Sequence, residues 1–242
     1  MVLLQYCAMT SNILSSLIDQ LEEKREKKKV FFALQLSLLF VSLMLLTKVI
    51  EWLFETSFVT LGVYPQTGQG LFGIITSPFI HGDWKHLWSN IPPMFVLGSL
   101  FVYFHRRNFK EVFVLLWVVS GLWLWFFGRQ TYHVGASGLI YALAAYLITY
   151  GFVLRNAATL AITFLVILFY GSMIWFVLPI MERISWEGHL TGALSGVFLG
   201  IYYGKEAKRQ LYRVSGAVNF TFTTKFSESV RFNYEYKEKK EK

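Results

Sequence analysis

The sequence predicts an all-α polytopic membrane protein, folded as a bundle of six transmembrane helices. Hydrophobic residues make up 55% of the 242 residues and charged residues only 16%, whereas an average soluble domain has about 25% charged residues. Apolar runs long enough to cross a bilayer recur along the chain, and the basic residues gather between these runs. Together these features exclude an ordinary soluble domain.

Three segments in the first half of the chain meet or approach the length of a spanning helix, which is roughly 20 mostly apolar residues with about 17 as the lower limit. Val30–Thr47 has no charged residue and is bounded by a lysine at each end. Leu87–Phe104 is interrupted by one asparagine and a pair of prolines, and Val112–Gly128 is dense in Trp, Phe and Leu. Each is expected to form one membrane-spanning helix.

The second half of the chain supplies three more spans. Gly135–Leu154 and Ala157–Leu178 contain no charged residue. Leu190–Gly204 is short, but its small residues allow a neighbouring helix to pack closely against it. The predicted core domain therefore covers residues 30–204.

Polar segments flank this domain. In residues 1–29, apolar side chains recur at helical spacing before a charged run, which predicts a short amphipathic helix on the inner membrane surface. Those side chains are Ile13, Leu14, Leu17, Ile18 and Leu21. In the basic tail, residues 205–242, an alternating patch at Val218–Thr223 can pair as a strand, and Lys237–Lys242 is expected to be disordered.

The basic residues predict the orientation of the bundle. With the N-terminus inside, only four of the 23 lysines and arginines fall on the outer side, and an excess of basic residues inside is the pattern that sets topology. Those four are Lys48, Lys85, Arg129 and Arg183. The first 20 residues show no signal peptide. We therefore expect a multi-pass protein of the cell (inner) membrane, with both termini in the cytoplasm.

The net charge of +8 could indicate either a nucleic-acid partner or contact with the membrane surface. Because the basic residues cluster in loops and tails, they suit contact with anionic lipid better than with nucleic acid. Cys7 is the only cysteine, so neither an intramolecular disulfide nor a cysteine-rich metal site is expected. His81 and His86 suggest a metal site as a minor alternative, which the lack of a nearby carboxylate or cysteine ligand disfavours. No cofactor is expected.

Four polar side chains converge if this topology holds. The second, fourth and sixth helices all run from outside to inside, and His86, Ser137 and His189 begin them, with Asn90 one turn after His86. Polar groups inside a membrane are costly without partners. The topology therefore places a hydroxyl, two imidazoles and an amide together in the outer third of the bilayer.

These residue types suit nucleophilic catalysis. A serine hydroxyl needs a base to take its proton, and histidine serves this role near neutral pH, so Ser137 and His189 form a candidate dyad. His86 and Asn90 share one helix face, where they can donate to an oxyanion together with the Ser137 backbone N–H. Tyr141, one turn after Ser137, can pack its ring against His189.

No third member of a triad is evident. Asp19 lies on the inner side, Asp83 lies in the outer loop, and Glu187 is two residues before His189, a spacing that does not share a helix face. A Ser–His dyad is therefore the simpler interpretation.

Glycines allow the dyad helices to approach each other. Gly192 and Gly196 belong to a row of small residues on one face of the sixth helix, and Gly138 begins a matching row on the fourth. Such rows let helix backbones pack closely in lipid. Close packing there would bring Ser137 and His189 within hydrogen-bonding reach.

These residues resemble the rhomboid family of intramembrane serine proteases, over roughly residues 79–200. Three blocks in order carry the resemblance. They are Phe79-Ile80-His81 through His86-Leu87-Trp88-Ser89-Asn90, then Gly135-Ala136-Ser137-Gly138 with Tyr141, then Gly188-His189 with Gly192 and Gly196.

The resemblance implies a six-helix core whose long first loop, Glu51–His81 here, lies partly in the membrane. It implies Ser137 as nucleophile, His189 as base and Tyr141 stacked on that base, with His86 and Asn90 as oxyanion donors. It also implies single-pass membrane proteins as substrates and no cofactor. The fifth helix and the loop above the site are expected to gate substrate entry. Many members carry a Trp-Arg pair in the first loop, and the matching position here is Phe72-Gly73. The anchoring of this loop is therefore expected to differ from that in those members.

Other interpretations remain open. Taken alone, the Gly135–Gly138 string is a helix-packing motif, and His189 is a buried core histidine. His81 is expected to hold the first loop in place. His105 and His133 are expected to be loop or interface residues without further partners. One alternative function is that of a catalytically inactive rhomboid-like protein, which binds transmembrane clients without cleaving them. A transporter or channel is another, and the apolar inner halves of the helices disfavour it.

Overall fold

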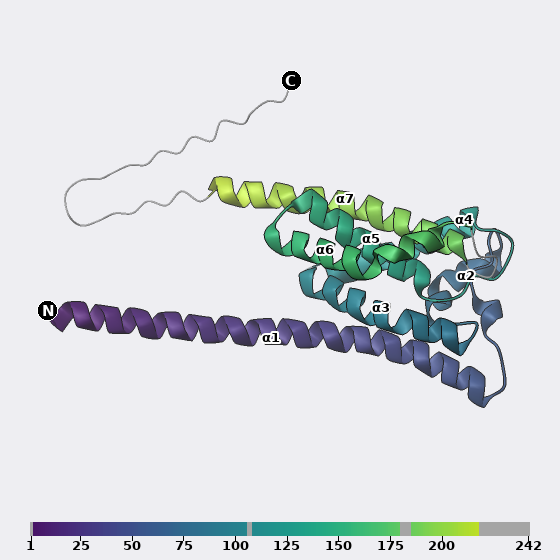
Figure 1. Ribbon diagram of the computed structural model, residues 1–242, viewed down its shortest axis with the longest axis horizontal. Coiled ribbons are helices and arrows are strands. Elements are labelled where there is room, and N and C mark those ends of the chain that lie inside the picture. Colours follow the sequence, from purple (N-terminus) through teal and green to yellow (C-terminus); the bar gives the residue numbers. More distant parts are fainter. Residues whose placement is uncertain (1, 106–107, 180–184, 218–242) are drawn as a thin grey trace, which may run out of the picture.

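The computed structural model describes residues 2–105, 108–179 and 185–217, with side chains from residue 16 to residue 212 within these ranges. These residues are almost entirely helical (Figure 1). The α-helices are α1 (Val2–Leu53), α2 (Gly68–Thr76), α3 (Trp84–Phe104), α4 (Phe109–Phe127), α5 (Ser137–Leu154), α6 (Ala157–Tyr170) and α7 (Trp186–Ala217). The 3-10 helices are η1 (Val59–Leu61), η2 (Ser77–Phe79) and η3 (Gly171–Val177).

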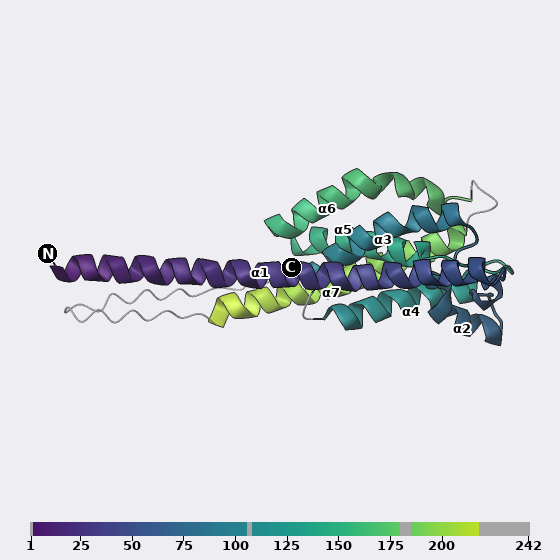
Figure 2. The same ribbon diagram turned by 90° about the horizontal axis from the view of Figure 1, so that it is seen from below.

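Helix α5 lies at the centre of the bundle. It packs most extensively against α7, and also against α6, α3 and α4, while α1 packs on α3. Helices α3, α5 and α7 all begin at the same end of the bundle, next to α2 (Figure 1). We call this the α2 end. At the opposite end, α1 extends far beyond the other helices (Figure 2).

The predicted polytopic helical bundle is confirmed. Five helices among the described residues are long and apolar enough to cross a membrane. They are Ser16–Leu53, Trp84–Phe104, Phe109–Phe127, Ser137–Leu154 and Ala157–Val177. Helix α7 is not among the five, so the sixth span stays a prediction.

The N-terminal helix differs from the expectation. The amphipathic segment and the first span are not separate helices, because α1 continues without a break from Val2 to Leu53. No glycine or proline interrupts these residues, and ion pairs such as Lys27 with Glu23, at spacing i,i+4, support the helix through its charged part.

The last two predicted spans also have different boundaries. Helix α6 ends at Tyr170, and the chain continues as η3 to Val177. Helix α7 begins at Trp186, ahead of the predicted Leu190, and continues to Ala217. The predicted strand at Val218–Thr223 and the disordered end of the tail lie outside the described residues.

The first loop is tied to the bundle by tryptophans of α4. Trp117 Nε1 donates to the carbonyl of Ile74 at 2.7 Å, and Trp125 Nε1 donates to the carbonyl of Thr67 at 2.8 Å. An antiparallel bridge joins Val63 to His133. Helix α2 and the turn that precedes α5 are thereby held at one end of the bundle.

Candidate functional site

Ser137 is the first residue of α5 and is half-buried. The turn before it depends on Gly135, whose φ of +110° is unfavourable for other residues. A Cβ atom at this position would lie 2.7 Å from His86 Nε2, so the His86 ring lies directly against the Gly135 backbone. The start of α3 and the turn carrying Ser137 are therefore in contact, as the topology predicted.

His189 lies in the first turn of α7 and is buried. Its ring stacks on Tyr141, with the centroids 4.2 Å apart and the planes 10° apart, so the predicted ring contact is present. His189 Nδ1 lies 2.8 Å from the carbonyl oxygen of Phe176 in η3. Because a carbonyl can only accept, Nδ1 carries the proton and a neutral ring leaves Nε2 as the basic nitrogen.

Glycines bring α5 and α7 into backbone contact. A Cβ atom on Gly192 would lie 2.0 Å from the Gly138 carbonyl oxygen, and one on Gly196 would lie 2.3 Å from the Ala142 carbonyl oxygen. Contacts this short leave no room for a side chain. The glycine face predicted for the last helix is therefore present, and it sets the distance between the helices of Ser137 and His189.

The two side chains of the candidate dyad begin adjacent helices at the α2 end. Among the described residues no hydrogen bond joins Ser137 Oγ to His189. Catalytic hydrogen bonds are often long before substrate binds and tighten in the complex. The structure therefore places the dyad residues on neighbouring elements without the contact itself.

Asn90 is buried on α3, one turn after His86. Its Nδ2 donates to the His86 carbonyl at 2.8 Å, and its Oδ1 is buried without a hydrogen-bond partner. The amide predicted to stabilise an oxyanion thus bonds its own helix in this state. Asp83 caps the same helix, because its Oδ1 accepts from the His86 backbone N–H at 2.7 Å.

His81 connects the first loop to the serine turn. It is 1% exposed, and its Nε2 accepts from the Ala136 backbone N–H at 3.5 Å, a long contact. Its ring meets that of His86 edge to face, with centroids 5.0 Å apart. Burial and the nearby His86 lower the pKa of His81 to about 3, so the ring is neutral near pH 7. His81 therefore contacts both the turn before Ser137 and the start of α3, and its role in holding the first loop stays a prediction.

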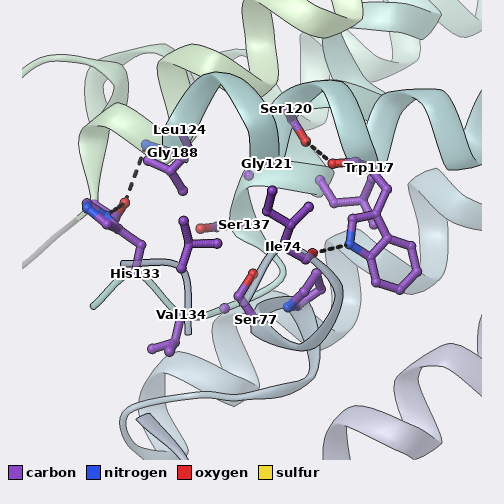
Figure 3. Close-up of a pocket in the computed structure, with 16 residues that line it drawn as sticks. Ile74, Ser77, Trp117, Ser120, Gly121, Leu124, His133, Val134, Ser137 and Gly188 are labelled. Carbon is purple, nitrogen blue, oxygen red and sulfur yellow. Dashed lines mark hydrogen bonds between the residues drawn. The ribbon is translucent and has the colours of Figure 1, made fainter. Parts of the chain in front are cut away.

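A small pocket of about 40 Å³ lies beside Ser137 (Figure 3). This is room for on the order of two or three water molecules. Its lining includes Ser77, Ser120, His133, Ser185 and Gly188. In the described part of the chain no group of three or more His, Cys, Asp or Glu side chains is arranged to hold a metal ion.

His133 was expected to lack partners, and this expectation is wrong. The ring is buried, with Nδ1 2.6 Å from Ser185 Oγ and Nε2 3.0 Å from the carbonyl oxygen of Arg129. Burial lowers the pKa of His133. Arg129 also pairs with Glu187, with Nε 2.9 Å from Oε1. The loop before α5 is therefore fastened to the start of α7, a long-range contact that no local spacing indicates.

The Phe72-Gly73 pair has a steric explanation. A Cβ atom on Gly73 would lie 2.1 Å from the carbonyl oxygen of Gly62, while Phe72 is exposed. Gly73 thus allows α2 to pack against the backbone of the first loop. A side chain at this position would force the two segments apart.

The fold and this arrangement define a polytopic α-helical membrane protein with polar side chains gathered where three parallel helices begin. The model of the Rhomboid domain matches residues 68–206, a range that includes Ser137, His189, His86 and Asn90. The chain belongs to the rhomboid family, a family of intramembrane proteases.

Relatives in mycobacteria are similar over most of this chain. Uncharacterized protein Rv1337 of Mycobacterium tuberculosis is 32% identical over 190 residues, which cover 74% of this chain and 79% of that protein. Uncharacterized protein Mb1372 of Mycobacterium bovis matches to the same extent. Uncharacterized protein ML1171 of Mycobacterium leprae is 33% identical over 169 residues, which cover 66% of this chain and 67% of that protein.

Proposed function

We propose that this protein is an intramembrane serine endopeptidase that cleaves single-pass transmembrane proteins near the outer face of the cell membrane. Ser137 is the nucleophile and His189 the general base. The observation that carries the proposal is the placement of His189, which is stacked on Tyr141 of the serine helix and hydrogen-bonded through Nδ1 to Phe176. This arrangement leaves Nε2 as the proton acceptor on a helix in backbone contact with that of Ser137.

In the proposed reaction, His189 Nε2 takes the proton of Ser137 Oγ as the oxygen attacks the scissile carbonyl. The resulting oxyanion is stabilised by the Ser137 backbone N–H and by donors from His86 and Asn90. His189 then gives its proton to the leaving amine, and water hydrolyses the acyl-enzyme with His189 again as base. The pocket beside Ser137 can hold that water.

The test is fluorophosphonate labelling and cleavage by purified protein in detergent or liposomes. Wild type, Ser137→Ala and His189→Ala are compared, with a panel of single-span substrates. Labelling and cleavage by wild type that both variants lose would support the protease. Folded wild type that is neither labelled nor active would overturn it and favour the alternative, an inactive family member that binds transmembrane clients.

A further inference from the structure

A buried ion pair that the proposed chemistry does not use lies at the α2 end of α1. Lys48 and Glu51 are three residues apart, with Nζ and Oε2 separated by 3.1 Å and side chains 12% and 4% exposed. A buried ion pair is weak evidence for stability, because the cost of removing two charges from water offsets their attraction. Its other contacts are therefore more informative than the pair itself.

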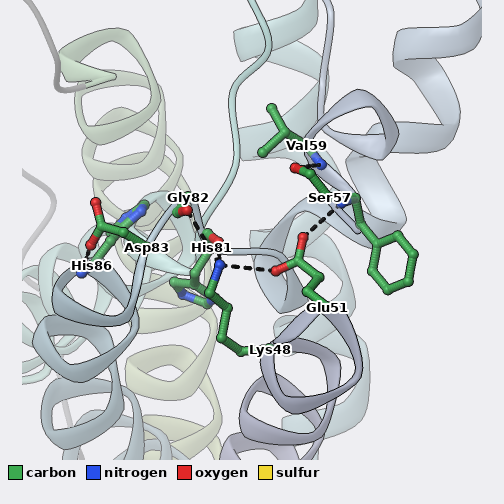
Figure 4. A network of polar contacts seen from close by, with 9 residues as sticks. Lys48, Glu51, Ser57, Val59, His81, Gly82, Asp83 and His86 are labelled. Atoms are coloured by element: carbon green, nitrogen blue, oxygen red, sulfur yellow. Dashed lines mark hydrogen bonds and ion pairs between the residues drawn. The ribbon is translucent and has the colours of Figure 1, made fainter. Parts of the chain in front are cut away.

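Lys48 uses all three of its ammonium donors. Besides Glu51 Oε2, Nζ donates to the carbonyl oxygens of His81 at 2.9 Å and Gly82 at 3.2 Å (Figure 4). An ammonium group has three donors and no acceptor, so the side chain is fully satisfied. A residue of α1 thus holds the end of the first loop.

Glu51 holds the beginning of the same loop. Its Oε1 accepts from the Phe58 backbone N–H at 2.6 Å, and its carbonyl accepts from the Thr56 N–H at 3.0 Å. The ion pair therefore joins the two ends of the first loop across a single turn of α1.

The loop end held by Lys48 contacts the candidate site at three points. The Ser77 carbonyl accepts from the Gly135 N–H at 2.9 Å, and the His81 ring accepts from the Ala136 N–H. Asp83 caps α3 at His86. Residues 77–83 thus contact both the turn before Ser137 and the first turn of α3.

We propose that Lys48 and Glu51 are positioning residues for this site, acting through residues 77–83 on the Ser137 turn and on the start of α3. Where it concerns activity, the inference rests on the proposed function. The competing possibility is that the pair only stabilises the end of α1. The decisive feature is then the donation from Lys48 to two carbonyls, which an ion pair within one helix does not require.

The first test removes both charges, so that neither remains buried alone. Lys48→Met/Glu51→Gln is compared with Lys27→Met/Glu23→Gln, which removes an ion pair of the same helix whose side chains are 74% and 64% exposed. Two quantities are measured in detergent: the rate of fluorophosphonate labelling, and hydrogen exchange of peptides covering residues 77–83 and 133–138. We expect labelling at least about tenfold slower and faster exchange confined to those peptides, with the control like wild type.

Two further variants separate positioning from helix stabilisation. Lys48→Arg keeps donors for the carbonyls and should restore most of the labelling rate. The exchanged pair Lys48→Glu/Glu51→Lys keeps the attraction but places a carboxylate against the His81 carbonyl, and should not restore it. If Lys48→Glu/Glu51→Lys restores the labelling rate, the inference is overturned. It is also overturned if hydrogen exchange in Lys48→Met/Glu51→Gln rises uniformly across the protein.

The outcomes also distinguish this inference from the proposed function. Wild type that is never labelled contradicts the protease, while the exchange measurement still tests the coupling of α1 to the Ser137 turn. If wild type and Lys48→Met/Glu51→Gln are labelled at equal rates and show equal hydrogen exchange, the proposed protease is still supported. The positioning role of Lys48 and Glu51 is then rejected.

Discussion

Tyr141 and His189 lie ring on ring, 4.2 Å apart, and both side chains reach the same 3-10 helix. Tyr141 OH donates to the Met173 carbonyl at 2.6 Å, while His189 Nδ1 contacts the Phe176 carbonyl at 2.8 Å. The imidazole is therefore held on one face by an aromatic ring and at one edge by a backbone oxygen. In the proposed dyad, η3 orients the imidazole and fixes its tautomer, the role that a carboxylate has in a Ser-His-Asp triad.

The two roles of Tyr141 can be separated by mutation. Tyr141→Phe keeps the stacked ring and loses the bond to Met173, and a typical hydrogen bond contributes about 0.5–1.5 kcal/mol. We expect kcat/KM to fall by about tenfold or less. Tyr141→Ala removes the ring as well, and we expect a fall of about 100-fold or more. Cleavage kinetics on one substrate check this order, and equal losses in the two variants would contradict a role for the ring.

The contact between α5 and α7 predicts that Gly192→Ala is destabilising. The new Cβ would lie 2.0 Å from the Gly138 carbonyl oxygen, and overpacking typically costs about 1–3 kcal/mol. We expect the thermal midpoint in detergent to fall by about 3–10 °C. Gly68→Ala is the control, because a Cβ there meets nothing within 4 Å. A Gly192→Ala midpoint equal to that of the control would show that the helices can separate without cost.

Much of this arrangement could be predicted because it depends on local pattern. Apolar length identified the five described helices that are long and apolar enough to cross a membrane, while the sixth span stays a prediction. The alternation of helix direction placed His86, Ser137 and His189 at one end of three parallel helices. The glycine spacing around Gly192 predicted the close contact with α5. Each of these inferences needs only helix geometry and the length of a bilayer-crossing segment.

Other features could not be predicted, because they depend on contacts between distant segments. The bond between His133 and Ser185 joins residues 52 positions apart, and Lys48 reaches a carbonyl 33 positions away. Phe176 contributes through a backbone oxygen, which no residue type indicates. Lys48 and Glu51 did carry one signal, since two charges three residues apart follow an apolar run, but their partners became visible only in the folded chain.

Asn90→Ala is expected to lower kcat by about 10²–10³-fold, the typical cost of one lost oxyanion donor, while the protein stays folded. In this structure Asn90 Nδ2 donates to the His86 carbonyl at 2.8 Å and to Ser89 Oγ at 3.4 Å. Because the amide NH2 has two donors, one of these two bonds would have to be given up for a bond to the oxyanion. Ser89→Ala is the matched control, because Ser89 Oγ donates to the same carbonyl at 2.7 Å but is exposed. Equal losses in both variants would indicate that holding the His86 carbonyl, and not stabilising an oxyanion, is the role of Asn90.

The buried His81 predicts an acid-sensitive fold. Its pKa of about 3 lies below the value of about 6.5 for a histidine in the unfolded chain, so between these values the unfolded state binds the additional proton. The free energy of unfolding is therefore unaffected above about pH 6.5 and falls as the pH drops toward 3, by up to about 1.4 kcal/mol per pH unit for one group. His81→Gln should reduce the slope of the thermal midpoint between pH 7 and 4.5. Because burial also lowers the pKa of His133, part of the slope should remain, and an unchanged slope in His81→Gln would contradict a neutral, buried His81.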